Sequence, residues 1–292
     1  MTAVAEIYAL YLATGAVTGL LAGLLGIGGG LIMVPALLAC FPAVGVPAAS
    51  IPALALGTSL TTICVSSLLA SHEHVRVGNL SQPFSGPMPR LMAWLAIGVL
   101  AGTALATRLP VRAVVACVAV FQIFVASRML HRSLKPQADI AAGAANANTV
   151  ETAQSRLDAK RAGPFFVATG ALCSIAGIAG TSLMVPYFRA RGIEHRKAAA
   201  LATWFNCIIG ALGFVSYGLL AGPDRAIPMA LGYVSLPALA GLAFGTSLFV
   251  RYGARLSRRL PPALLMRGFC CFLYVSGGKA LFAITLSPAI SA

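Results

Sequence analysis

The sequence predicts an all-α polytopic membrane protein built from two inverted repeats, and three observations lead to this fold class. The chain of 292 residues is 59% hydrophobic and only 10% charged, whereas soluble domains carry about 25% charged residues. Apolar runs of the length that crosses a bilayer, about 17–25 residues, recur along the chain. Two similar segments, GIGGGLIMVP at 26–35 and GIAGTSLMVP at 177–186, lie 151 residues apart and indicate a duplication.

The polar stretches between the apolar runs set the expected order of elements. The stretch 132–163 is polar and alanine-rich, includes Arg156 and Asp158, and is expected to be a flexible cytoplasmic linker. The first transmembrane repeat is therefore placed at 1–131 and the second at 164–292. Each repeat is expected to contain four hydrophobic helical segments: 9–41, 50–70, 91–107 and 113–131, then 164–188, 197–220, 227–250 and 263–286.

The first segment of each repeat carries the duplicated motif and is expected to break inside the membrane. In the first repeat Gly28, Gly29 and Gly30 interrupt the apolar run, and each glycine costs a helix interior about 1 kcal/mol relative to alanine. Backbone that is not helical survives at membrane depth only where it is buried in protein or lines a cavity. The pattern favours a re-entrant hairpin, whose two limbs enter and leave on one face of the membrane.

The other three segments of the two repeats correspond in order, which extends the duplication beyond the glycine motif. The matched positions are 55–58 with 200–203, Gly98 and Gly102 with Gly241 and Gly245, 109–110 with 260–261, and Arg128 with Lys279.

The distribution of Lys and Arg favours the inverted arrangement. With two re-entrant hairpins each repeat crosses the membrane three times, so the second repeat is inverted relative to the first. Sixteen Lys and Arg then flank the cytoplasmic side, and only Arg108, Arg112 and Arg225 lie outside, in agreement with the positive-inside rule. Four simple spans per repeat would instead put loop 42–49, which has no Lys or Arg, on the same side as the basic loop 189–197. The predicted orientation places both termini outside.

The same rule explains the net charge of +14 without a nucleic-acid partner, because the basic residues lie in loops between apolar runs. The seven cysteines lie in or beside apolar runs without metal-ligand spacing, and they are interpreted as small packing residues. The sequence contains no catalytic triad and no nucleotide-binding motif. We therefore expect no enzyme, no cofactor and no bound metal.

The two predicted breaks form the candidate substrate site. Free N–H groups and the helix dipole at the start of a half-helix make an anion site, and inverted repeats place two such ends face to face near the midplane. In the alternative interpretation the glycines only allow close helix packing. The predicted binding residues are Gly28, Gly29 and Gly30 in the first repeat and Gly180, Thr181 and Ser182 in the second.

Polar side chains on the next segment of each repeat are predicted to line the path of the substrate. Thr58 and Ser59 belong to the first repeat, and Thr203 and Asn206 belong to the second. They could donate hydrogen bonds beside the half-helix ends. In the alternative interpretation the Ser and Thr hydroxyls bond the carbonyls of their own helix.

Charged residues are scarce inside the apolar segments. Arg267 lies about one turn into the last segment, while Arg128 and Lys279 lie near segment ends, where snorkelling to the interface is the favoured interpretation. No Asp or Glu lies inside any apolar segment, although proton relays and many sodium sites are built on buried carboxylates. An anion that leaves the cell gains about 2.3 kcal/mol per charge per 100 mV of inside-negative potential. A passive or weakly coupled exporter is therefore expected.

The glycines of the first repeat follow the pattern Gly19-x-x-x-Gly23-x-x-Gly26-x-Gly28-Gly29-Gly30, with Val34-Pro35 after it, and Gly177-x-x-Gly180 precedes Val185-Pro186 in the second. Together these two motifs resemble those of the sulfite exporter TauE/SafE family, and the resemblance covers nearly the whole chain. The second motif departs from the glycine-rich form at Ala179 and Thr181. The resemblance implies transport of sulfite, sulfoacetate or a related sulfonate across the bacterial inner membrane.

The predicted function is export of a small sulfur-containing anion by a multi-pass protein of the bacterial inner (plasma) membrane. The predicted partners are the anionic substrate, the lipid bilayer and a coupling ion, either H⁺ or Na⁺, and a homodimer is left open. Three alternatives remain. They are an importer of the same or another small organic anion, an anion channel, and a membrane enzyme or accessory subunit.

Overall fold

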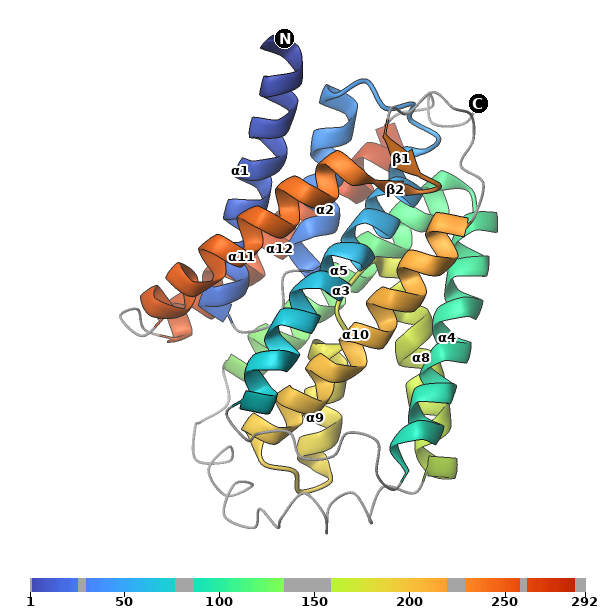
Figure 1. Cartoon of the computed structure of the whole chain (residues 1–292), viewed down its shortest axis with the longest axis vertical. Coiled ribbons are helices and arrows are strands. Elements are labelled where there is room, and N and C mark those ends of the chain that lie inside the picture. The colour runs from blue at the N-terminus through green and yellow to red at the C-terminus, as the bar shows by residue number, and fades with distance from the viewer. Residues whose placement is uncertain are drawn as a thin grey trace.

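The structure, a computed structural model of the chain, describes residues 2–25, 30–76, 87–133, 159–219, 229–257 and 262–286. These residues form helices that lie side by side as a bundle, together with short turns and one small β-hairpin (Figure 1). The helices are α1 (Thr2–Leu25), α2 (Gly30–Ala43), α3 (Ile51–Arg76), α4 (Met88–Arg108), α5 (Val111–Ser133), α8 (Ala159–Ala176), α9 (Thr181–Ala190), α10 (His195–Leu219), α11 (Leu236–Ser257) and α12 (Pro262–Leu286).

Within the described residues, five stretches are long and apolar enough to cross a bilayer. They are Glu6–Leu24 in α1, Ile51–His72 in α3, Met88–Arg108 in α4, Val111–His131 in α5 and Arg196–Leu219 in α10. The protein is an all-α polytopic membrane protein, as the composition predicts. Most of the predicted linker 132–163 lies outside the described residues, and its last five residues belong to α8.

Both segments that carry the glycine motif are divided into two helices, as predicted. The first consists of α1 and α2, with the break at 26–29 outside the described residues, and the second consists of α8 and α9. The helices after the breaks have 14 and 10 residues, which is about 21 and 15 Å at 1.5 Å per residue. Neither is long enough to cross a hydrocarbon core of about 30 Å. Figure 1 shows α2 returning to the end of the molecule where α1 begins, and α9 returning to the end where α8 begins.

The helices of the two halves of the sequence are interleaved rather than packed as separate units. Helix α1 packs along α11 and α8 along α4, while α3 packs against α10 and α5 against α12. By sequence, α1, α3, α4 and α5 are the counterparts of α8, α10, α11 and α12. Exchanging the two repeats therefore leaves this set of helix pairs unchanged. The counterparts α3 and α10 lie side by side and run in opposite directions (Figure 1).

Matched glycines on α4 and α11 let their neighbours approach closely. A Cβ built on Gly102 would lie 2.6 Å from the carbonyl oxygen of Ala171 on α8. A Cβ built on the matched Gly245 would lie 2.7 Å from the backbone nitrogen of Ala16 on α1. Such approaches between backbones are typical of packed membrane helices, so these two glycines serve helix packing.

The helical segment expected at 227–250 begins later than predicted. Strands β1 (Ala230–Leu231) and β2 (Val234–Ser235) form an antiparallel hairpin, and α11 starts only at Leu236. The turn of the hairpin contains Gly232 with φ +56°. The Ser235 hydroxyl accepts the backbone N–H of Ala238 at 3.4 Å, which caps the start of α11. Because the hairpin is as apolar as the helix, hydropathy alone does not separate the two.

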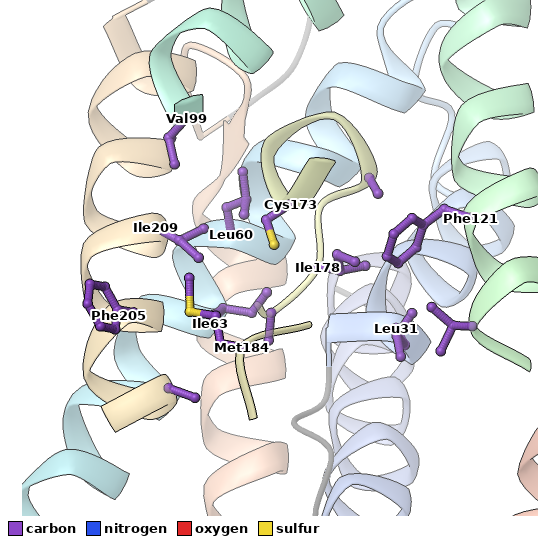
Figure 2. Packing of buried hydrophobic residues seen from close by; sticks show 14 of the residues in the cluster. Leu31, Leu60, Ile63, Val99, Phe121, Cys173, Ile178, Met184, Phe205 and Ile209 are labelled. Carbon is purple, nitrogen blue, oxygen red and sulfur yellow. The ribbon is translucent and has the colours of Figure 1, made fainter. Parts of the chain in front are cut away.

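The larger of the two hydrophobic clusters joins the two repeats at the centre of the molecule. Leu31 of α2 and Ile63 of α3 belong to it together with Ile178 from the α8–α9 break, and each is 2% exposed. Figure 2 shows these side chains with Met184 of α9 and Phe205 of α10. The start of α2 and the α8–α9 break thus share one hydrophobic core.

Candidate functional site

The break between α8 and α9 has a defined backbone structure. Gly177 has φ +64°, and the N–H of Ile178 donates to the carbonyl of Cys173 at 3.0 Å. This is the hydrogen bond of the Schellman motif, which ends a helix through a residue in the left-handed region. The carbonyl of Gly177 also accepts the hydroxyl of Ser59 at 2.7 Å. A residue of the first repeat therefore holds the break of the second.

The first turn of α2 lies directly against this break. A Cβ built on Gly30 would lie 2.7 Å from the backbone nitrogen of Ala179 and 3.1 Å from Cα of Ile178. Gly30 is the first residue of α2, and Ala179 lies two residues before α9. The N-terminal ends of the two half-helices therefore meet. The predicted ligands Gly28 and Gly29 lie outside the described residues.

The start of α9 is organised by the side chain of Asn206 on α10. Gly180 donates its N–H to Asn206 Oδ1 at 2.8 Å. Asn206 Nδ2 in turn donates to Thr181 Oγ1 at 2.6 Å. The structure thus brings three predicted site residues together, but the N–H of Gly180 already has an acceptor within the protein.

Other donors at the start of α9 have no acceptor in their own helix. The backbone N–H groups of the first turn, here those of Thr181 and Ser182, precede any intrahelical carbonyl that they could reach. The hydroxyl oxygen of Ser182 is buried and has no hydrogen-bond partner within the part of the chain that the structure describes. A buried donor without an acceptor costs about 1–3 kcal/mol, so this end of α9 is suited to a ligand rich in acceptors.

The remaining predicted residues take part in structural hydrogen bonds. Thr58 Oγ1 is buried and accepts the N–H of Ser235 at 3.1 Å, which ties α3 to the β-hairpin. Ser59 holds Gly177, as described above. Thr203 donates to the carbonyl of Ala199 one turn back in α10 at 2.8 Å, as the alternative interpretation of these hydroxyls predicts.

Replacing Ser59 by alanine is expected to lower the free energy of unfolding by about 1 kcal/mol. The substitution leaves the carbonyl of Gly177 without its 2.7 Å donor from the other repeat. Thermal unfolding in detergent measures the loss. The matched control is Ser66→Ala, because Ser66 also lies on α3 but bonds its own helix at Ile63. Equal melting temperatures for the two variants would contradict a role for Ser59 in holding the break.

A buried polar cluster between α4, α8 and α10 was not predicted. The hydroxyl of Thr103 lies 2.5 Å from that of Ser174, and Ser216 donates to Thr103 at 3.2 Å. Tyr217 donates to the carbonyl of Ser174 at 3.2 Å. The only sequence signal is the match of Gly102, the residue before Thr103, with Gly245, and it says nothing of partners on other helices. The hydrogen bonds of this cluster link α4, α8 and α10 near the α8–α9 break.

The charges of the described residues leave the meeting point of the half-helices free of carboxylates. The acidic residues whose side chains the structure describes are Glu6, near the start of α1, and Glu194, in the turn before α10. No group of three or more His, Cys, Asp or Glu that could hold a metal ion occurs among the residues searched, which are the described ones. Helix N-termini without an adjacent carboxylate favour an anionic ligand.

The basic residues of the apolar segments lie on the outer surface of the bundle. The side chains of Arg128 on α5 and of Arg267 and Lys279 on α12 are all exposed. Their exposure agrees with side chains that snorkel along the lipid-facing surface.

Comparisons with known proteins agree with this architecture. A family model described as sulfite exporter TauE/SafE matches residues 11–280. A probable membrane transporter protein of Haemophilus influenzae is 30% identical over 273 residues, which cover 91% of this chain and 95% of the relative. A probable membrane transporter protein of Methanocaldococcus jannaschii is 24% identical over 275 residues, or 92% and 93% of the two chains. No solved structure gives a significant match. The chain therefore belongs to the sulfite exporter TauE/SafE family of membrane transporters.

Proposed function

We propose that the protein exports a small sulfur-containing anion, such as sulfite, sulfoacetate or a related sulfonate, across the bacterial inner membrane. The substrate binds beside the point where the N-terminal ends of α2 and α9 meet, within reach of the donors of both. The observation that carries this proposal is the contact of Gly30 with Ala179, since it brings two half-helix ends to one point. The aligned N–H groups and dipoles of both helices then act on the same ligand.

The side chains at this point suit an oxyanion. Thr181 and Ser182 add two hydroxyl donors to the backbone N–H groups of α9, and the hydroxyl of Ser182 is buried without a partner among the described residues. A sulfonate or sulfite offers three oxygens, each able to accept several hydrogen bonds. Hydrogen bonds to a charged acceptor contribute about 1.5–3 kcal/mol each, so each donor that converges on the anion matters for its affinity.

The second repeat is proposed to be inverted relative to the first, with each glycine-broken segment re-entrant. The unchanged set of helix pairs on exchange of the repeats supports this arrangement, as do the opposite directions of α3 and α10. Transporters with inverted repeats alternate access by moving one repeat against the other around a site at the midplane. The proposed transport cycle exposes the meeting point of α2 and α9 to each side of the membrane in turn.

The binding step is tested by thermal unfolding of the purified protein with sulfite, sulfate, thiosulfate, sulfoacetate, taurine and carboxylate analogues. A ligand that binds only the folded state stabilises it by about 2.7 kcal/mol at a concentration of 100 Kd. We expect one sulfur oxyanion or sulfonate to raise the melting temperature. Stabilisation by none of these compounds, or only by cations or apolar compounds, would refute the anion site.

Thr181→Val is expected to raise the Kd for the bound anion by about tenfold to a hundredfold, because it removes one hydrogen bond to a charged ligand. The ligand dependence of the melting temperature gives the Kd. The matched control is Thr169→Val on α8, whose hydroxyl is buried but bonds the carbonyl of Phe165 in its own helix. An unchanged Kd for Thr181→Val would remove Thr181 from the site.

Direction and mechanism need a flux assay in proteoliposomes. An exporter driven by the membrane potential moves the anion out of vesicles that are negative inside, and its rate saturates with substrate. An importer coupled to H⁺ or Na⁺ would move it inward against that potential when the ion gradient is imposed. Flux that does not saturate, with single-channel current steps, would identify an anion channel instead.

A further inference from the structure

The side chain of Asn206 has a fixed orientation because its two ends bind different partners. A backbone N–H can only donate, so the atom that faces the N–H of Gly180 at 2.8 Å is the amide oxygen. The other end is therefore the NH₂ group, which can only donate. It lies 2.6 Å from the hydroxyl oxygen of Thr181.

This orientation decides what the hydroxyl of Thr181 can do. Its oxygen accepts the hydrogen bond from Asn206, so its own proton points elsewhere. A threonine inside a helix usually donates to the carbonyl four residues back. For Thr181 that residue is Gly177, which lies before α9 and whose carbonyl accepts the hydroxyl of Ser59. The proton of Thr181 is left for an acceptor outside this set of hydrogen bonds.

We infer that Asn206 is a positioning residue that makes Thr181 an obligate hydrogen-bond donor to the substrate, so that the site selects anions whose oxygens are all unprotonated. The inference rests on the proposed function and specifies which oxyanions that site accepts. Sulfonates carry no proton on their oxygens at neutral pH, whereas phosphonates, hydrogen phosphate and hydrogencarbonate do. A protonated oxygen needs an acceptor, whereas the backbone N–H groups at the start of α9 and the proton of Thr181 can only donate.

Methanesulfonate and methylphosphonate are the probes that test this selectivity. They have nearly the same shape, and at mildly acidic pH both carry a single negative charge, but methylphosphonate keeps one P–OH. We expect the wild-type protein to bind methanesulfonate at least about tenfold more tightly, the effect of one unmade hydrogen bond to a charged ligand. At alkaline pH methylphosphonate loses its proton, and this preference is expected to fall.

Asn206→Asp reverses the hydrogen bond to Thr181. The carboxylate still accepts the N–H of Gly180, but it also accepts the proton of Thr181, whose oxygen then offers only lone pairs to the substrate. The ratio of the Kd for methylphosphonate to the Kd for methanesulfonate is expected to fall from about ten to about one.

Two substitutions of Thr181 provide the controls. Thr181→Val should abolish the preference for methanesulfonate without adding a charge, and Thr181→Ser should restore it. In the Thr181→Val background, Asn206→Asp should leave the ratio unchanged, because the two residues act through one hydrogen bond.

The ratio of the two Kd values distinguishes a positioning role of Asn206 from a purely structural one. If the substitution only disturbed the local structure, it would weaken the binding of both probes equally and leave the ratio unchanged. Wild-type selectivity retained in Asn206→Asp, with methanesulfonate still bound, would overturn the role of Asn206 and leave the proposed anion site intact. Absence of any anion binding by the wild-type protein would overturn the proposed function and this inference together. Melting temperatures without ligand show whether each variant is folded.

Discussion

Gly30→Ala is expected to abolish substrate binding and to destabilise the protein by about 1–3 kcal/mol, the usual cost of overpacking a well-packed interior. The new methyl group would lie 2.7 Å from the nitrogen of Ala179 and 3.1 Å from Cα of Ile178, which are backbone atoms. Neither atom can move without shifting the whole α8–α9 break. The N-terminal ends of α2 and α9 must therefore separate, and the two sets of donors no longer converge on one ligand.

A matched control isolates the contact from the effect of the extra methyl group. Gly278 lies in α12, where a Cβ would have no other atom within 4 Å. Gly278→Ala is expected to be neutral or to stabilise by up to about 1 kcal/mol through helix propensity. The measurements are the melting temperature in detergent and the Kd for the bound anion. If Gly30→Ala bound the anion as tightly as Gly278→Ala, the meeting of the half-helices would not be the binding site.

Composition and duplication were sufficient to predict the membrane class and the two broken segments. Long apolar runs have few structural solutions in lipid, and a repeated glycine cluster interrupts helix propensity at a definite place. The β-hairpin before α11 could not be predicted in the same way. Its strands have two residues each, which is too short for an alternating pattern, and hydropathy does not change across Gly232.

The geometry of the candidate site was predictable in outline, but its hydrogen bonds were not. The glycine motifs located both half-helix ends, because each motif lies where a helix must start again. The partner of Gly177 lies 118 residues away at Ser59, and the partner of Gly180 lies 26 residues away at Asn206. No local pattern encodes such pairs. The sequence therefore suggested Gly180 as a backbone ligand, whereas Asn206 accepts its N–H and Thr181 and Ser182 hold the unused donors.

Gly177→Ala is expected to destabilise the protein by about 2–5 kcal/mol, because two costs combine at this residue. The backbone has φ +64°, and the left-handed region costs a residue with a Cβ about 1–2 kcal/mol. The new Cβ would also lie 2.7 Å from side-chain methyl groups of both Val34 and Leu56, and overpacking costs about 1–3 kcal/mol more. Since Val34 belongs to α2, the substitution also disturbs the contact between the two half-helices.

Gly45→Ala separates these two costs. Gly45 has φ +79° in the turn after α2, but a Cβ there would have no other atom within 4 Å. Its substitution should therefore show only the backbone cost of about 1–2 kcal/mol and leave transport intact. Gly177→Ala should lose both more stability and the anion-dependent rise in melting temperature. Equal effects of the two substitutions would mean that the packing of the break against α2 and α3 contributes nothing, and that Gly177 is needed only to end α8.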